Sequence, residues 1–346
     1  MRFLRLAALS VFVAQPPTLA PTPIPAVDGV IEALRSNQLV AISDPHGSSA
    51  TRSFIRQLIA DPRFATLVDD IVVEIGNARH QSLVDDYVGG RPVTEAALAD
   101  VWLNTTVANQ IAADVEWFKA VRRINRLRPE RPMRILLGDP PIDWTKVRTR
   151  DDHFKWLSQR DSFPAALIQT EVIARERKAL IVYGHLHFQR RQMMSNFFMD
   201  DWRAQTIVSL IERAGPTRVH TIWKLGEELT GAFPAAKAWP HPALVNVKGT
   251  SLGALDMAQL YPKALRAQIV DGVMKPVSRD AWAPMAVEQQ LDAVLYLGDG
   301  ADDAFIDRPV EVCARPGFLE ERLRRIALTG IPRFEADAIQ SLCAPR

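Results

Sequence analysis

Side chains that commonly act in catalysis follow four short apolar runs of this sequence. Each run is rich in β-branched residues and ends at Gly, Pro or Asp, which is typical of a buried parallel strand and its exit turn. In open α/β sheets, ligands bind beyond the carboxyl ends of such strands. We therefore expect one pocket to collect the acidic and imidazole groups at these ends: Asp44, His46, Glu74, Asp139, His185 and His187.

The second run ends in a glutamate, Glu74, which is unusual for a wholly apolar strand. Burying a carboxylate costs several kcal/mol unless it is paired. Arg79 is the natural partner, and Arg52 or Arg56 on the preceding helix could also reach it. Glu74 is then either half of a structural ion pair or a functional group, a general base or a metal ligand. His80 follows directly after Arg79 and is a supporting candidate.

Two pairs of residues have a spacing of two that suits a shared ligand. Asp44 and His46 lie two apart on an extended turn, and His185 and His187 lie two apart where a strand ends, so each pair is expected on one side. Asp139 lies before a proline and is either a turn former or functional. The oxygen and nitrogen donors suffice for zinc or manganese, and equally for a metal-free acid/base site. The candidate metal ligands are Asp44, His46, Asp139, His185 and His187.

The elements that must position these residues alternate along the chain. We predict strands at 39–43, 71–75, 134–137, 179–183, 219–223, 243–247 and 293–297. Helical spacing of apolar residues is found at 48–60, 163–178 and 201–214, and a long helical region at 95–127 contains more than one helix. This alternation predicts an α/β fold with a mostly parallel or mixed central sheet, flanked by helices and carrying helical insertions.

The N-terminus predicts export to the periplasm or the medium. A short basic start, an apolar stretch at 6–14 and a Pro/Thr-rich segment suggest that residues 1–26 are a signal peptide and linker. The apolar stretch is shorter than the roughly 20 residues that span a bilayer, so no transmembrane anchor is expected. The alternative is a disordered tail of a cytosolic protein. Residues 27–346 are predicted to form a single α/β domain with a C-terminal extension from about residue 305.

The charge composition gives no reason to expect nucleic acid as a partner. The chain has 42 basic and 40 acidic residues, so it offers no charge excess for nucleic acid, and we expect a small-molecule substrate. Its two cysteines, Cys313 and Cys343, are either a disulfide, as export would permit, or two reduced thiols. No pattern assigns an oligomeric state.

In motif order, the chain resembles the erythromycin esterase-like proteins and their relatives, the haem-uptake ChaN-like and Tiki/TraB proteins. His46 with Gly47 matches the family's first His-Gly, Glu74 matches its second-strand glutamate, and His187 matches its late histidine. Ser43 stands where the family has its first glutamate, and His185 where it has an asparagine. The resemblance spans about residues 38–200.

The resemblance implies an α/β fold and hydrolysis of an ester-like bond. His46 would be the base that activates water, since histidine titrates near neutral pH. Glu74 would orient or stabilise His46, and Arg79 would hold Glu74 or an anionic group. His187 would be a second acid/base or a metal ligand.

Two other functions remain open at this stage. Calcineurin-like metallophosphoesterases also combine Asp-x-His-Gly, Gly-Asp and Gly-His-x-His motifs, which are similar to those around Asp44, Asp139 and His185 here. That family places Gly-Asp before Gly-Asn-His, whereas Gly76 and Asn77 come first in this chain, followed by Ala78. The second alternative is a ChaN-like protein without catalysis, in which histidines would bind haem iron.

Overall fold

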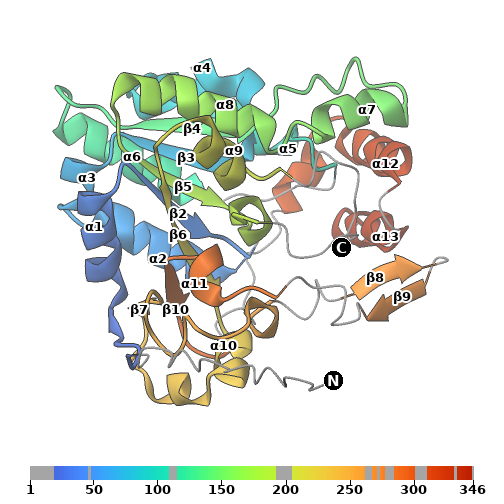
Figure 1. Cartoon of the computed structure of the whole chain (residues 1–346). Coiled ribbons are helices and arrows are strands. Elements are labelled where there is room, and N and C mark those ends of the chain that lie inside the picture. The colour runs from blue at the N-terminus through green and yellow to red at the C-terminus, as the bar shows by residue number, and fades with distance from the viewer. Residues whose placement is uncertain are drawn as a thin grey trace, which may run out of the picture.

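The computed structural model describes residues 19–45, 48–108, 115–191, 205–261, 267–270, 273–276, 284–300, 310–330 and 333–344. Their centre is an eight-stranded mixed sheet with the strand order β1-β7-β10-β6-β2-β5-β3-β4 (Figure 1). The predicted α/β class is confirmed.

Six neighbouring strands of the sheet are parallel, and two more strands extend one edge, each antiparallel to the strand before it. The parallel strands are β10 (Ala293–Tyr296), β6 (Val219–Leu225), β2 (Leu39–Ser43), β5 (Ala179–Tyr183), β3 (Asp70–Asn77) and β4 (Arg134–Asp139). The other two are β7 (Ala243–Asn246) and β1 (Ile24–Pro25), so the end of the predicted linker adds an edge strand. A separate hairpin consists of β8 (Ala267–Val270) and β9 (Val273–Pro276).

Helices cover both faces of the sheet, which explains why β2 and β5 are buried along their whole length. Val40 and Ile42 of β2 face one helical layer, while Leu39 and Ala41 face the other. The first layer contains α1 (Ala26–Ser36), α2 (Ser49–Ala60), α3 (Phe64–Leu67), α4 (Gln81–Val88), α5 (Glu95–Leu103) and α6 (Val115–Leu127). The second contains α8 (Ser162–Glu171) and α9 (Ile207–Ala214), and further along the sheet α10 (Glu227–Ala232) and α11 (Val287–Gln290).

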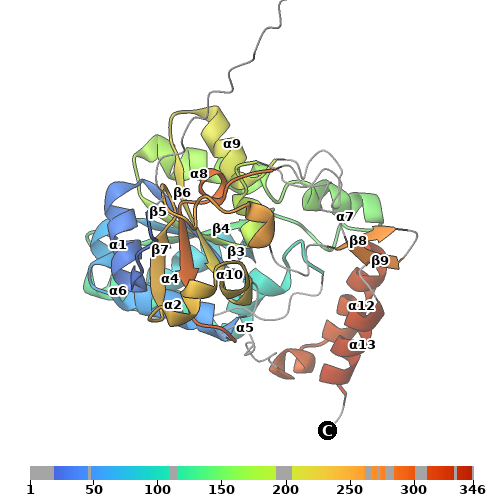
Figure 2. The ribbon, with the colours of Figure 1, turned by 60° about the horizontal axis from the view of Figure 1, so that its bottom comes forward.

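The C-terminal helices α12 (Phe318–Thr329) and α13 (Arg333–Leu342) lie side by side at one end of the molecule, near α7 (Arg150–Leu157), in both views (Figures 1 and 2). Arg322 of α12 is buried and donates hydrogen bonds of 2.8 Å to the carbonyl oxygens of Leu103 and Ala108. The helix is therefore docked on the segment that follows α5.

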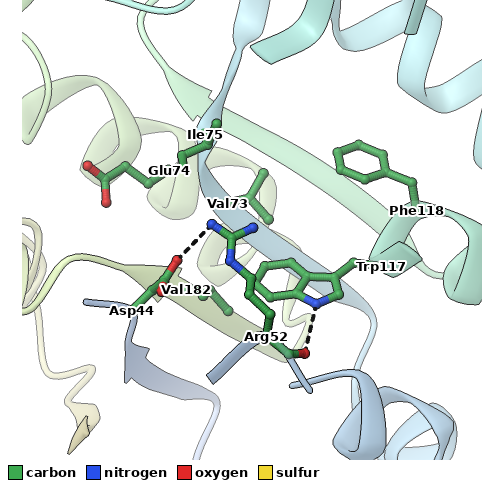
Figure 3. A pocket seen from close by; sticks show the side chains of 8 residues that line it. All are labelled: Asp44, Arg52, Val73, Glu74, Ile75, Trp117, Phe118 and Val182. Carbon is green, nitrogen blue, oxygen red and sulfur yellow. Dashed lines mark hydrogen bonds and ion pairs between the residues drawn. The ribbon is translucent and has the colours of Figure 1, made fainter. Parts of the chain in front are cut away.

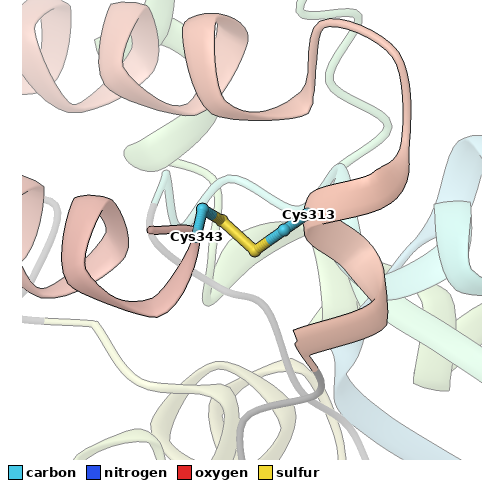
Figure 4. The surroundings of a disulfide bond; sticks show 2 residues. All are labelled: Cys313 and Cys343. Carbon is cyan, nitrogen blue, oxygen red and sulfur yellow. A yellow bond between two sulfur atoms is a disulfide. The ribbon is translucent and has the colours of Figure 1, made fainter. Parts of the chain in front are cut away.

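Cys313 and Cys343 form a disulfide that links the segment before α12 to the end of α13 (Figure 4). Of the two states that the sequence left open, the structure has the disulfide. The bond closes a loop with a sequence separation of 30 residues. Restricting the unfolded chain in this way stabilises the fold by about 3–4 kcal/mol. We expect a double Cys→Ser variant to lose that amount in urea unfolding, and an unchanged midpoint would contradict this account.

Among the residues that the structure describes, none of the helices combines the length and apolarity needed to cross a membrane. The apolar stretch at 6–14 lies outside the described residues.

Candidate functional site

Four of the predicted site residues meet at one edge of the sheet. The strands β2, β5, β3 and β4 are neighbours and run parallel, so their carboxyl ends lie side by side. These ends carry Asp44, Glu74 and Asp139, and His187 lies just beyond β5 in the 3-10 helix η3 (His185–Phe188). His46 follows Asp44 by two residues in the sequence and lies outside the described residues.

Three donors among the described residues hold the Glu74 carboxylate. Oε2 accepts the backbone N–H of Gly184 at 2.7 Å, while Oε1 is ion-paired with Arg160 and lies 3.4 Å from Nε2 of His187. The residue is only 6% exposed, so these partners replace the water that the charge would otherwise require. Glu74 therefore links two cationic side chains, Arg160 and His187, and fixes their positions.

Arg79, the predicted partner of Glu74, points elsewhere. The chain turns after β3 into the short helix η1 (Ala78–His80), and the Arg79 guanidinium pairs with Asp143 at 3.3 Å. Arg79 is half-exposed, and Arg52 is engaged by Asp44. His80 lies in the same helix, and no contact with Glu74 is seen among the described residues. The actual partner, Arg160, comes from the turn between α7 and α8.

His187 lies between two carboxylates. Nδ1 is 2.9 Å from Oδ1 of Asp161, and Nε2 faces Glu74. Burial by itself lowers the pKa of His187, but the charges of Asp161 and Glu74 outweigh it and raise the pKa to about 9. The ring is therefore an imidazolium at neutral pH, with a proton on each nitrogen.

Asp139 is a second buried carboxylate at this edge. It accepts hydrogen bonds from the backbone N–H and the hydroxyl of Thr106, and Nε of Arg160 lies 4.0 Å away. Burial raises the pKa of Asp139 to about 7, although Arg160 and the Thr106 hydrogen bonds oppose the shift. Arg160 thus lies between Glu74 and Asp139. The site contains one group with a pKa near neutral, Asp139, and one with a pKa well above it, His187.

Gly138 leaves room for the tip of Tyr183. A Cβ at position 138 would lie 1.6 Å from the Tyr183 hydroxyl, so any larger residue must displace the ring. The Tyr183 ring in turn contacts His187 edge-on, with 5.4 Å between centroids. We expect Gly138→Ala to cost about 1–3 kcal/mol in urea unfolding, because overpacking moves the ring. Adding Tyr183→Phe should recover part of that loss, and strictly additive effects would contradict the proposed clash.

The two histidines of the Gly-His-Leu-His motif face different surroundings. They were predicted on one side because residues two apart share a face of a strand. The structure places them in a 3-10 helix, where residues two apart are rotated by about 240°. His185 packs against Trp223 and Tyr261, with centroid distances of 5.3 and 6.3 Å, while His187 faces Glu74.

The described donors do not fit a metal centre. Within the described ranges, no three His, Cys, Asp or Glu side chains are arranged to hold a metal ion. The ring nitrogens of His187 already face two carboxylates, Nδ1 that of Asp161 and Nε2 that of Glu74, and Asp44 is bound by Arg52. His185 lies on the other side of η3, and the predicted ligand His46 is outside the described residues.

A small pocket adjoins the site on the side of α6 (Figure 3). Its apolar walls come from β3, β5 and α6, and an ion pair between Asp44 and Arg52, 3.1 Å apart, lies at one end. The guanidinium of Arg52 is 5.0 Å from the ring centroid of Trp117. The residues that line the pocket are Asp44, Arg52, Val73, Glu74, Ile75, Trp117, Phe118 and Val182.

Sequence reasoning missed three residues that shape the site: Thr106, Arg160 and Asp161. None of them follows an apolar strand, and Arg160 lies 86 residues after its partner Glu74. The one available signal was the buried charge of Glu74, which requires a cation somewhere in the chain without indicating which one.

The pentapeptide from Gly249 to Gly253 has the Gly-x-Ser-x-Gly spacing of a nucleophile elbow, but the structure does not form one there. The segment is a turn after β7, and no helix follows Ser251 directly. Because β7 is antiparallel to β10, its carboxyl end lies at the edge of the sheet opposite Glu74. Ser251 is therefore not part of the candidate site.

No family model matches the chain, and no curated protein matches its sequence. Among solved structures, it is similar to the type III effector HopBA1, with 14% identity over 82% of this chain and 99% of that one, at a TM-score of 0.38. A variant of the erythromycin esterase EreC in its open conformation has 11% identity, coverage of 78% and 92%, and a TM-score of 0.48. ChaN of Campylobacter jejuni, in a structure with cofacial haem, has 10% identity, coverage of 59% and 91%, and a TM-score of 0.35. EreC and ChaN belong to the families that the motifs resemble. At these identities the likeness is one of fold alone.

Proposed function

We propose that this protein hydrolyses the ester-like bond of an uncharged substrate at the carboxyl edge of the sheet. The observation that carries the proposal is the largely buried row Arg160–Glu74–His187–Asp161, which holds a protonated imidazole between two carboxylates. A protonated histidine in a fixed position is suited to donate a proton to a leaving group. The proposal rests on these side chains, because proteins of similar fold often differ in function.

In the proposed reaction, His46 accepts a proton from water as the water oxygen attacks the carbonyl carbon. The bond between the carbonyl carbon and the leaving-group oxygen then breaks, and Nε2–H of His187 protonates that oxygen. Nε2 is the suitable donor because its 3.4 Å contact with Glu74 is long, whereas Nδ1 is held by Asp161 at 2.9 Å. Glu74 and Asp161 keep the ring oriented, and solvent restores both protonation states.

The other two functions gain no specific support from the described residues. A haem protein would need a large apolar cavity, whereas the pocket beside the site is small and has a charged end. A two-metal phosphoesterase would need His187 as a metal ligand, whereas its two ring nitrogens face the carboxylates of Asp161 and Glu74.

Activity on a panel of neutral aryl esters and lactones tests the proposal. We expect hydrolysis by the purified protein and a loss of about 100-fold or more in kcat for His46→Gln and for His187→Gln. His241→Gln, at an exposed position before β7, is the matched control and should keep wild-type rates. Turnover of an aryl phosphodiester only after addition of manganese, or a Soret shift on haem titration that depends on His46, would contradict the proposal.

Export is part of the same proposal. Its support is the signal-like pattern of residues 1–26 together with the disulfide, which persists best in an oxidising compartment. N-terminal sequencing of protein recovered outside the cytoplasm should reveal a chain that starts near residue 20. A full-length chain found only in the cytosolic fraction would overturn it.

A further inference from the structure

Two buried aspartates at opposite ends of the parallel strands are paired very differently. Asp70 begins β3 and is fully buried, and each of its oxygens accepts hydrogen bonds from both Arg134 and Arg177, at 2.7–3.2 Å. This carboxylate is saturated, as expected for a purely structural ion pair. It provides an internal reference for the pair at the other edge.

Asp44, at the carboxyl end of β2, has a single charged contact among the described residues. Oδ2 accepts one hydrogen bond from Nη2 of Arg52 at 3.1 Å. Both side chains are buried, yet Oδ1 of Asp44 and Nε of Arg52 have no hydrogen-bond partner among the described residues. Leaving a charged group this poorly satisfied costs free energy, so a fold that needed only stability would not retain it.

The surroundings of this pair hold it in place without satisfying it. The Arg52 guanidinium lies over the Trp117 ring, and the indole Nε1–H donates to the carbonyl oxygen of Arg52 at 3.4 Å (Figure 3). Of the remaining lining residues, all are apolar except Glu74. Two residues that line the pocket beside Glu74 therefore have one spare acceptor and one spare donor between them.

The charges determine what kind of group fits. Asp44 is paired with Arg52, and Glu74, the other charged residue of the lining, is paired with Arg160, so the pocket offers no unbalanced charge that would favour an anionic or a cationic group. Only a group that donates to Oδ1 and accepts from Nε satisfies both atoms, and a hydroxyl or a primary amide does this without carrying charge. The apolar walls favour a short hydrocarbon part behind it.

We propose that the Asp44–Arg52 pocket is a specificity subsite for a small, neutral, hydroxyl- or amide-bearing group of the substrate. The subsite lies on the α6 side of the sheet edge, and Arg160, Asp161 and His187 lie toward α8. A bound substrate would thus reach across the edge, with its polar group on Asp44 and its scissile bond near His187. This inference rests on the proposed hydrolase function but is tested separately by binding.

Propionamide is a suitable probe, with propionate and propylammonium as charged analogues of similar shape. The chain has 8 tryptophans, and the Trp117 indole N–H signal in a two-dimensional NMR spectrum is assigned by its loss in Trp117→Phe. We expect propionamide to shift this signal in a saturable way and both charged analogues to leave it unchanged. Equal shifts by propionate, or no shift because only a resident water occupies the pocket, would overturn the proposal.

Two substitutions examine the pair itself. Arg52→Lys keeps the positive charge but removes Nε, and Asp44→Asn keeps the shape but removes the carboxylate; each should weaken propionamide binding about tenfold or more. The matched control is Arg134→Lys, which alters the saturated pair around Asp70 and should leave binding unchanged. Unaltered binding in Arg52→Lys, with the fold intact by circular dichroism, would contradict the assignment.

Kinetics separate this inference from the proposed function. With esters that carry a terminal amide, Asp44→Asn should raise KM about tenfold and leave kcat within about twofold, because the subsite contributes binding away from the reacting atoms. Propionamide binding without any hydrolysis would refute the hydrolase and leave the subsite standing. Hydrolysis with a KM that is unchanged in Asp44→Asn would refute the subsite without contradicting the hydrolase function.

Discussion

Glu74→Gln is expected to abolish nearly all hydrolysis, lowering kcat by about 100- to 10,000-fold. The substitution keeps the side chain's shape but removes the charge that Arg160 and His187 share. The imidazolium would lose one of the two charges that stabilise it and would no longer be held at a fixed angle. Removing one member of a buried ionic network also costs about 3–5 kcal/mol, which urea unfolding should detect alongside the kinetics.

The control for this experiment is Glu171→Gln. Glu171 also pairs with an arginine, Arg134 at 2.9 Å, but that pair lies at the start of the strands and is partly exposed. The Glu171→Gln variant should lose little stability and no activity. If Glu74→Gln proves poorly folded, Glu74→Asp retains the charge and should fold while still losing activity, because the shorter side chain shifts the carboxylate away from its three donors. Activity of Glu74→Gln within tenfold of wild type would refute the role given to this carboxylate.

The second large effect is a fall in stability as the pH rises from about 6.5 to about 9. The folded protein holds the His187 proton more tightly than the unfolded chain, since the pKa is raised from 6.5 to about 9. That stabilisation is complete below the pKa of His187 in the unfolded chain. It is lost as the pH rises through the pKa of His187 in the folded protein. The difference corresponds to about 3 kcal/mol of unfolding free energy.

Urea unfolding across this range, for wild type and His187→Gln, measures the effect. The wild-type protein should lose stability toward pH 9, and the variant should show a flatter profile. Asp139 adds a separate decline between about pH 4 and pH 7, because burial raises the pKa of this carboxyl to about 7 and so favours its protonated form in the folded state; this decline should persist in the variant. Parallel wild-type and variant curves between pH 6.5 and 9 would contradict the charged state assigned to His187.

The sequence by itself determined the fold class and the edge at which chemistry gathers. Apolar, β-branched runs such as 39–43 and 179–183 form buried parallel strands, and the structure gives both with these bounds. Parallel strands in one sheet have their carboxyl ends at the same edge, so Asp44, Glu74 and Asp139 had to lie near one another. The apolar runs predict the strands and their ends because each run is a local pattern in the sequence.

Only the tertiary structure decided which side chains satisfy these charges. Glu74 takes Arg160, 86 residues away, instead of the nearby Arg79, because η1 turns Arg79 aside toward Asp143. Residues His185 and His187 separate because the chain leaves β5 as a 3-10 helix, not as a continued strand. A buried charge specifies only that a partner of opposite charge must come close. Which residue meets that need depends on how distant turns pack, and no local pattern in the sequence encodes it.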